Sequence, residues 1–459
     1  MVQRNTYSII NPATEEVVGS LPVMEKEEIH AIVAKAKSVQ REWEQIGLKK
    51  RLAILDACSR EIEKHADSIA LTVQKETGKP FGLAKVDPLG ISGRLDYLVT
   101  NAAGILKDEK FNFGPNLQGV IEHRARGVVA VICPWNFPLA IAAGMFGPAL
   151  AAGNTVVVKP SKSTPFCMLE VEKPFARAGM PDGVFQVITG TGQAGAHLVD
   201  ADINMVSFTG SSQVGQEIKT ALKNRLIPVA LELGGKDPYI VMGKVDIERV
   251  AQNCVDMGVS NNGQACCSVE RVYVDEAIAD RFIAALLEKI RAIKTVETNP
   301  DDCEIGPFTT EAQMKTVIGQ VEDAVKQGAR ILHGGKRIAR KGYFFQPTLV
   351  VDVNHSMRLM REETFGPVIP VMRVKTDEEA IALANDCEFG LSASVWCKNG
   401  KRAQAMAARL ESGTVWVNTP WAFDNQMPWG GVKNSGFGRI MSKYGLLECC
   451  EIYSKYYGK

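Results

Sequence analysis

The residues best suited to covalent chemistry lie in the segment 261–271, whose sequence is NNGQACCSVER. Cys266 follows a turn of small and polar residues and precedes a strand-like run, 271–274. A thiol at such a turn can face a cleft and act as a nucleophile. Taken alone, the segment favours a buried cysteine that packs as a small hydrophobe. Other parts of the chain must decide between the two interpretations.

Two further segments hold groups that a thiol nucleophile needs. Glu232 lies between two leucines and ahead of two glycines, and apolar neighbours raise the pKa of a carboxyl group toward the range of a general base. A surface ion pair is the commoner role of a single glutamate. Asn136 lies between aromatic residues in the segment 134–138, where a fixed amide can donate to a developing oxyanion. A helix-capping asparagine is the alternative, which this segment alone favours.

Three segments are candidates for binding phosphate or ribose. The segment 190–195 matches G-x-G-x-x-G, but the acidic residue expected about twenty positions later is absent, so a tight turn is favoured there. Gly210 and Ser211 follow a strand and precede a helix, whose N-terminus favours anions; an ordinary serine cap is the alternative. The segment 159–165 ends another strand and contains two lysines. Open α/β sheets bind ligands at such ends, although a solvated loop is favoured for this segment alone.

Strands and helices alternate over two regions, which predicts a doubly wound α/β architecture. The first region has predicted strands at 128–132, 155–158, 184–188 and 205–208 and helices at 138–152, 165–178 and 193–199. The second, from about 232 to 418, has strands at 238–241, 271–274, 368–374, 394–397 and 414–417. Its predicted helices are 247–259, 277–292, 311–327, 377–385 and 401–411. Helices are also predicted at 26–46, 50–78 and 82–105, and a weak strand at 446–457.

Composition narrows the class of protein. The chain has 459 residues and a formal net charge of +1, which gives no reason to expect a nucleic acid or an anionic membrane as partner. The longest apolar stretch, 138–153, is too short to span a bilayer, and Met1–Thr6 lacks a signal-peptide core. Eleven cysteines without Cys-x-x-Cys spacing argue against a zinc cluster or a disulfide framework. We therefore expect a cytoplasmic protein without a metal ion.

Taken together and in this order, these segments resemble the NAD(P)-dependent aldehyde dehydrogenase superfamily over essentially the whole chain. The motifs that carry the resemblance are PWNFP at 134–138, KPS at 159–161, FTGS at 208–211, ELGGK at 232–236, GQAC at 263–266, ETFGP at 363–367 and GGVKNSG at 430–436. The resemblance favours Cys266 as the nucleophile, with Cys267 as its neighbour only. It implies two doubly wound α/β domains with a small oligomerisation hairpin.

The resemblance also implies domains and roles. It places a dinucleotide-binding domain at 1–116 and 128–231, a thiol domain at 232–420, and oligomerisation elements at 117–127 and 440–459. Asn136 and the Cys266 backbone N–H would hold the oxyanion, and Glu232 would activate water. The implied cofactor residues are Trp135, Lys159, Ser161, Lys162, Gly210, Ser211, Leu233, Glu363 and Phe365.

Two departures from the family pattern bear on specificity. Many members have glutamate at the position of Lys162, where it favours NAD; the lysine predicts that NADP is accepted and favoured. The segment 138–145 has small residues where relatives carry bulky or charged ones, which predicts a roomy, mostly apolar substrate tunnel. The alternative is that an arginine elsewhere in the chain binds a substrate carboxylate. We expect Phe137, Ile141, Gly144, Trp421 and Phe423 to line that tunnel.

The predicted reaction oxidises a semialdehyde, aliphatic or aromatic aldehyde to its acid through a Cys266 thioester, which water hydrolyses. A dimer or tetramer is expected. One alternative is an acylating dehydrogenase that passes the thioester to coenzyme A, against which Glu232 argues. The other is a catalytically silent structural or binding protein with the same fold, against which the presence of Cys266, Asn136 and Glu232 together argues.

Overall fold

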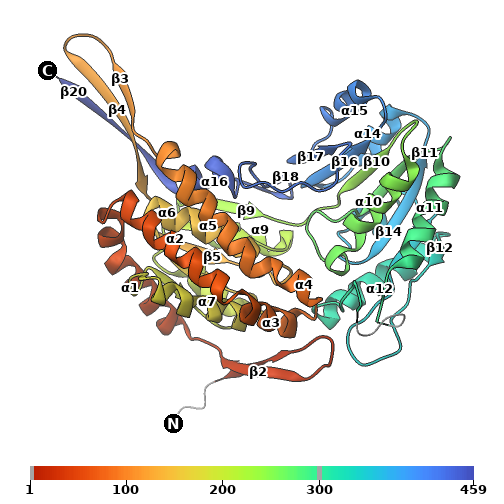
Figure 1. Cartoon of the computed structure of the whole chain (residues 1–459), viewed down its shortest axis with the longest axis horizontal. Coiled ribbons are helices and arrows are strands. Elements are labelled where there is room, and N and C mark those ends of the chain that lie inside the picture. Colours follow the sequence, from red (N-terminus) through yellow and green to blue (C-terminus); the bar gives the residue numbers. More distant parts are fainter. Residues whose placement is uncertain (1–4, 297–301, 459) are drawn as a thin grey trace.

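Two largely parallel sheets dominate the structure, a computed structural model that describes residues 5–296 and 302–458 (Figure 1). Residues 1–4, on which the predicted lack of a signal peptide partly rests, lie outside the described residues, as does residue 459. The chain begins with an antiparallel pair, β1 (Thr6–Ile10) and β2 (Val17–Pro22). No helix in the described ranges is long and apolar enough to cross a membrane.

The first sheet has the strand order β19-β9-β8-β5-β6-β7. Its strands are β5 (Val128–Ile132), β6 (Thr155–Lys159), β7 (Phe185–Val187), β8 (Met205–Thr209), β9 (Val229–Glu232) and β19 (Gly436–Phe437). Strands β5 to β9 are parallel, and β19 is antiparallel to β9. From β5 the chain proceeds to β6 on one side and later to β8 on the other. The carboxyl ends of β5 and β8 therefore flank a topological switch point, where open α/β sheets bind ligands.

Alternate residues of this sheet pack against helices on opposite faces, as expected for a buried parallel sheet. Val129 and Val131 belong to the core formed with α2 (Leu48–Lys64), α5 (Val86–Ile105), α6 (Ala140–Ala152) and α7 (Pro165–Arg177). Val128 and Ala130 pack with α1 (Lys26–Gln45), α8 (Gly192–Asp200) and α9 (Ser212–Ala221). The predicted strands of this region are confirmed, whereas β9 was not predicted.

The predicted helix 50–78 is wrong in its continuity. It is two helices, α2 and α3 (Ala66–Thr77), separated by His65 with φ −108° and ψ 7°. The ring nitrogen Nδ1 of His65 lies 2.8 Å from the carbonyl oxygen of Glu61, the acceptor that the backbone N–H of His65 would use in a continuous helix, and that N–H donates to the Ile62 carbonyl instead. The predicted helix 82–105 likewise divides into α4 (Phe81–Ala84) and α5.

The second sheet has the order β12-β13-β14-β11-β10-β16-β17. Its strands are β10 (Pro238–Val241), β11 (Arg271–Asp275), β12 (Arg330–His333), β13 (Thr348–Val351), β14 (Val368–Val374), β16 (Ser392–Trp396) and β17 (Thr414–Val417). Its helices are α10 (Ile247–Val259), α11 (Ala279–Ala292), α12 (Glu311–Lys326), α13 (Arg358–Arg361), α14 (Asp377–Asn385) and α15 (Gly400–Ala407). The predicted elements are found, with β12, β13 and α13 in addition, although the helix predicted at 401–411 ends at Ala407.

A three-stranded arm projects from the first sheet's side of the molecule (Figure 1). It has the order β20-β4-β3, with β3 (Glu109–Asn112), β4 (Leu117–Ala125) and β20 (Cys450–Gly458). Antiparallel pairing runs from Cys450 opposite Ala125 to Gly458 opposite Leu117. The predicted tail strand is wrong at its start, because residues 446–448 end α16 (Ser442–Glu448), which packs against α5 and α6. A short pair, β15 (Phe389–Gly390) and β18 (Val432–Lys433), completes the sheets.

Candidate active site

One cavity brings together residues from both sheets at the switch point of the first. The ends of β5, β8 and β9 form one wall. The loop that follows the 3₁₀ turn η1 (Ser260–Gly263), helix α12 and the segment 363–365 form the other. The lining residues are Pro134, Trp135, Asn136, Ile141, Thr209, Gly210, Ser211, Glu232, Leu233, Gly234, Cys266, Gln313, Thr316, Glu363 and Phe365. The three residues predicted for chemistry, Cys266, Glu232 and Asn136, thus share one cavity although they are far apart in the sequence.

Cys266 reaches this cavity because of the unusual backbone before it. Asn261 and Asn262 have left-handed φ values of 52° and 59°, which asparagine tolerates better than most residues. Gly263 has φ 70°, and a Cβ there would lie 2.2 Å from the carbonyl carbon of Gly366. The turn therefore requires glycine at this position, and it directs the thiol two residues past Gln264 toward the cavity.

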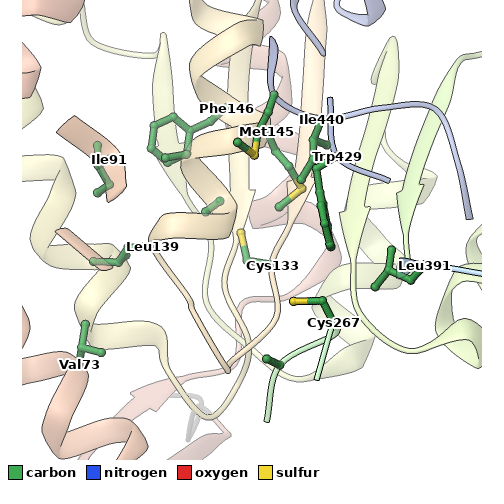
Figure 2. Close-up of a cluster of buried hydrophobic side chains, with 14 of the residues drawn as sticks. Val73, Ile91, Cys133, Leu139, Met145, Phe146, Cys267, Leu391, Trp429 and Ile440 are labelled. Atoms are coloured by element: carbon green, nitrogen blue, oxygen red, sulfur yellow. The ribbon is translucent and has the colours of Figure 1, made fainter. Parts of the chain in front are cut away.

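The Cys266 thiol is held protonated in this arrangement. Its contact with the Cys267 thiol, burial and the nearby Glu232 carboxyl raise its pKa well above the ordinary value. Cys267 itself is buried, and Figure 2 shows its side chain in the core with Cys133, Trp429 and Leu391. Only the first cysteine of the pair lines the cavity.

The Asn136 amide is fixed from both sides. Its Nδ2 donates to the carbonyl oxygen of Gln264 at 3.1 Å, so one of its two N–H groups is used and the second is available to a ligand. Its backbone carbonyl accepts from Lys79 Nζ at 2.6 Å and from Asn261 Nδ2 at 3.2 Å. These bonds tie the β5–α6 loop to the thiol turn.

A buried ion pair supports the same loop. Lys79 Nζ lies 3.1 Å from Asp87 Oδ2, and both side chains are almost fully buried. Asp87 Oδ1 accepts from the backbone N–H groups of Leu139 and Ala140 at 3.0 and 3.1 Å, next to the N-terminus of α6. A carboxylate near a helix N-terminus is favoured by the free N–H groups and the dipole. The sequence analysis missed this pair, whose members no motif singles out.

Glu232 ends β9 in a water-poor position. Burial raises the pKa of its carboxyl to about 7, although hydrogen bonds with Trp429, Cys266 and Thr209 oppose the shift. The indole Nε1 of Trp429 donates to Glu232 Oε1 at 3.2 Å. The raised pKa expected from apolar neighbours is confirmed, and it makes the group able to exchange a proton near neutral pH.

Two further carboxyl groups, those of Glu363 and Glu270, lie at the opposite edge of the cavity and beside it. Glu363 Oε1 accepts from the N–H of Gly235 at 3.1 Å, and burial raises its pKa to about 8, with Glu270 contributing. Glu270 accepts from the backbone N–H groups of Thr364 and Phe365 at 2.7 and 2.8 Å. Lys236 Nζ pairs with Glu270 at 2.7 Å. The buried Glu270 thereby fixes the loop that carries Glu363 and Phe365.

The predicted cofactor residues divide into two groups. Trp135, Gly210, Ser211, Leu233, Glu363 and Phe365 line the cavity, where the Trp135 and Phe365 rings meet edge-on with centroids 5.4 Å apart. Ser211 is exposed and caps α9 by accepting from Val214 N at 3.4 Å. Lys159, Ser161 and Lys162 lie outside the cavity lining, at and just beyond the end of β6, which neighbours β5.

Lys159 fits a polar or anionic ligand at this sheet edge. The side chain is 6% exposed, and burial lowers the pKa of its ammonium to about 8. The neighbours that act on the ammonium are Cys133 and Lys162, neither of which is a carboxylate. Burying an ammonium group is costly unless it is hydrogen-bonded, and a bound ligand can supply the acceptor that the neighbouring side chains do not. Together with the N-terminus of α9, this suits the ribose and phosphates of a dinucleotide.

The G-x-G-x-x-G segment lies away from the cavity lining. Gly190 has φ 143°, and its N–H donates to the Tyr7 hydroxyl at 3.2 Å. The Thr189 hydroxyl donates to the carbonyl of Pro22 at 3.1 Å. This turn therefore contacts the N-terminal hairpin of β1 and β2, in line with the tight-turn interpretation.

Of the five residues predicted to line the substrate tunnel, one lines this cavity. Ile141 lines it, while Phe137, Gly144, Trp421 and Phe423 lie outside its lining. The Trp421 and Phe423 rings pack with each other and with Trp416, at centroid distances of 5.7 to 6.4 Å. Phe423 also contacts Trp429 at 5.4 Å, edge-on. Through Trp429, this aromatic cluster reaches Glu232.

Gly144 faces a charged group that the segment 138–145 itself does not contain. A Cβ at Gly144 would lie 3.2 Å from Nε of Arg94, on the neighbouring helix α5. The expectation of an apolar surround here did not include this arginine. No local signal in the sequence connects Arg94 with Gly144, because the two residues meet only through helix packing. Thr209, Gln313 and Thr316 are further lining residues that the sequence analysis missed.

Known proteins match this chain over nearly its full length. The family model described as "Aldehyde dehydrogenase family" matches residues 1–454. Aminoaldehyde dehydrogenase 1, peroxisomal, from Pisum sativum is 36% identical over 95% of this chain and 89% of its own. Two solved structures are each 33% identical and cover 99% of this chain. The E. coli NADP dependent enzyme has a TM-score of 0.96 and 95% of its chain covered. The NAD+ complex of aldehyde dehydrogenase from Bacillus cereus has 0.95 and 93%.

These matches agree with the cavity, which joins a thiol, a carboxyl of raised pKa and an amide beside a sheet edge that suits a dinucleotide. They confirm the fold that the motifs predicted. The chain accordingly belongs to the aldehyde dehydrogenase family and oxidises an aldehyde to the carboxylic acid with NAD+ or NADP+.

Proposed function

We propose that Cys266 is the nucleophile of this oxidation, with Glu232 as the proton acceptor and Asn136 as an oxyanion donor. The observation that carries the proposal is the meeting of the three side chains in one cavity. Cys267 is excluded from the role because its thiol is buried in the core. The cavity provides the short separation that a nucleophile and its base require.

In the first step, Glu232 accepts the Cys266 proton, and the sulfur attacks the aldehyde carbon. A C–S bond forms, and the carbonyl oxygen becomes an alkoxide. The second N–H of the Asn136 amide and the backbone N–H of Cys266 donate to that oxygen. One such donor is worth about 3 to 4 kcal/mol in comparable sites. Because Lys79 and Gln264 already fix the Asn136 residue, little reorganisation is needed as the charge develops.

The cofactor, when bound, supplies the nicotinamide ring that accepts the hydride of the tetrahedral carbon. The carbon then remains bound to Cys266 as a thioester. Glu232 releases the Cys266 proton to solvent and then takes a proton from a water molecule, whose oxygen attacks the thioester carbon. The C–S bond breaks, the carboxylic acid leaves, and the sulfur is reprotonated. A carboxyl with a pKa of about 7 is suited to both proton transfers, because it gains and loses protons near neutral pH.

Residues on two sheet edges would hold the cofactor. The Ser211 hydroxyl and the N-terminus of α9, with Gly210, would bind the pyrophosphate. Lys159 and Ser161 would bind the adenosine ribose, and Glu363 the nicotinamide ribose, with Trp135, Leu233 and Phe365 packing nearby. Lys162 is exposed one residue beyond Ser161. Its positive charge would attract a 2′-phosphate, so NADP is favoured over NAD.

Steady-state formation of NAD(P)H with and without coenzyme A tests the hydrolytic reaction. Sustained turnover without coenzyme A is expected, because Glu232 supplies a water-activating base. A single-turnover burst that becomes sustained only with coenzyme A would favour the acylating alternative. Cofactor binding without oxidation of any aldehyde would favour the silent alternative.

The exposed arm supports assembly into a homodimer or homotetramer. Strands β20 and β3 are its two outer edges, and unpaired strand edges tend to pair with another chain. Ile452 and Tyr456 on β20 are 72% and 70% exposed, and Phe113 beside β3 is 56% exposed. Light scattering coupled to gel filtration tests this assembly. The eleven free cysteines support a reducing compartment, and we place the protein in the cytoplasm.

A further inference from the structure

A half-buried arginine beside α6 lacks the partners that such a side chain normally has. Arg94 extends from α5, and its Nε is buried without a hydrogen-bond partner in the described structure. One terminal nitrogen, Nη2, contacts only a weak acceptor, the Met441 sulfur, at 3.6 Å. Buried donors are almost always paired in folded proteins. The guanidinium therefore has donor capacity left for a ligand.

No carboxylate within the described residues forms an ion pair with Arg94. Burial lowers the pKa of the Arg94 guanidinium to about 10, and the more distant Asp87 carboxylate opposes this shift. The guanidinium therefore stays charged at neutral pH. Both Asp87 oxygens are already used, by Lys79 and by two backbone N–H groups. Asp424 lies nearby at Tyr97, but it is exposed and accepts from Gln426 N. A guanidinium with one buried, unpaired N–H and no counter-ion is stabilised by a ligand that supplies both an acceptor and a negative charge.

The position of Arg94 relates it to the reacting centre. Its Nε lies 3.2 Å from the point that a Cβ of Gly144 would occupy. Gly144 is three residues after Ile141 on α6, so the two lie on the same face of the helix, about one turn apart. Ile141 lines the cavity that contains Cys266. A second, small cavity beside Arg94 and Gly144 is also lined by the polar residues Tyr97, Asn425 and Ser442.

We propose that Arg94 binds the far carboxylate of the substrate, which is therefore a short aldehyde with a carboxylate at its other end. This assignment rests on the proposed function, in which the aldehyde carbon is held at Cys266. The planar guanidinium can form two parallel hydrogen bonds with a carboxylate. The absence of a side chain at Gly144 leaves Nε accessible. The same charge disfavours cationic aldehydes, the substrates named for the Pisum sativum relative.

A charge series in the wild-type enzyme tests the proposal first. Succinate semialdehyde and glutarate semialdehyde are compared with pentanal and with 3-aminopropanal, at low and at high salt. We expect kcat/KM to fall from the anionic to the neutral to the cationic aldehydes, by about tenfold or more at each step. Equal values for the carboxylate-bearing and neutral aldehydes would overturn the proposal, as would a preference for the cation. This series decides the question even if variants fail to fold.

The variant Arg94→Met then removes the charge but keeps the length of the side chain. We expect kcat/KM for the semialdehydes to fall about a hundredfold, mainly through KM, while that for pentanal is unchanged or higher. Arg60→Met, at an exposed position of α2, is the matched control and should leave every substrate unaffected. An equal loss for semialdehydes and pentanal would assign Arg94 a structural role and overturn the proposal.

The role of Cys266 and the role of Arg94 can be refuted separately. Cys266→Ala should abolish oxidation of semialdehydes and pentanal alike. Pentanal turnover that depends on Cys266, without any preference for carboxylates, would leave the proposed function intact and refute only the role of Arg94. Turnover that persists in Cys266→Ala would refute the proposed function itself.

Discussion

The Trp429 indole N–H donates to Glu232 Oε1 at 3.2 Å, and this bond joins the proposed proton acceptor to the aromatic cluster. Both groups are buried. A hydrogen bond to a carboxylate stabilises its charged form, so Trp429 keeps the Glu232 pKa from rising further than burial alone would take it. The geometry links the reactivity of Glu232 to the loop that carries Trp421 and Phe423.

Trp429→Phe should raise the pKa of Glu232, because it removes a donor to the carboxylate and retains most of the ring. A lost hydrogen bond to a charged group of about 1.5 kcal/mol corresponds to about one pH unit. The rising limb of kcat/KM against pH should therefore move upward by about that amount. Trp416→Phe is the control, since its indole donates instead to the Ala422 carbonyl in the same cluster. A shift of equal size in both variants would contradict this role of Trp429.

Glu232→Gln should abolish sustained turnover and also change the pH dependence of stability. The pKa of Glu232 is raised from 4.5 to about 7 in the folded protein, which binds more protons than the unfolded chain between those values. Glu232 therefore lowers the free energy of unfolding as the pH rises through this range, by up to roughly 3 kcal/mol. The glutamine side chain does not titrate, so the free energy of unfolding of the variant does not fall in this way. Its melting temperature should exceed that of the wild type at about pH 8.5 but not at about pH 4.5. The opposite ordering would contradict the raised pKa.

Glu270→Gln should weaken cofactor binding more than it slows the chemistry. Glu270 accepts from the N–H groups of Thr364 and Phe365 and pairs with buried Lys236. The neutral amide loses the ion pair and one good acceptor, so the loop that carries Glu363 loosens. We expect KM for the cofactor to rise about tenfold, with a smaller change in kcat. Glu288→Gln, exposed on α11, is the control. An unchanged KM would show that Glu270 does not position this loop.

Lys162→Glu should reverse the cofactor preference. A carboxylate at this exposed position can accept from ribose hydroxyls and repels a 2′-phosphate. The ratio of kcat/KM for NADP to that for NAD should fall at least tenfold, mainly through KM for NADP. Lys173→Glu, exposed on α7, applies the same change of charge at another position and should leave the ratio unaltered. An unaltered ratio in Lys162→Glu would refute the role of Lys162.

Sequence patterns predicted the parts of this molecule that depend on neighbouring residues. Mostly apolar runs identified β5, β6 and β8, and the apolar neighbours of Glu232 predicted its raised pKa. Motif order identified the family and placed Cys266 and Asn136 together. Breaks that depend on one side chain, such as His65 between α2 and α3, were not predictable from periodicity.

Contacts between distant segments were also beyond the sequence patterns. The Lys79–Asp87 pair and the Glu270–Lys236 pair support the site from positions that no motif marks. Arg94 meets Gly144 only because α5 and α6 pack together. Such pairs are set by tertiary packing, which a single sequence does not reveal.

Trapping the acyl group on the enzyme tests the central claim most directly. The enzyme is mixed with aldehyde and cofactor, quenched in acid within one turnover, and digested, and the acylated peptide is sequenced by mass spectrometry. The adduct should map to Cys266, and should be absent from Cys266→Ala but present in Cys267→Ala. An adduct on Cys267, or aldehyde oxidation by Cys266→Ala, would contradict the account.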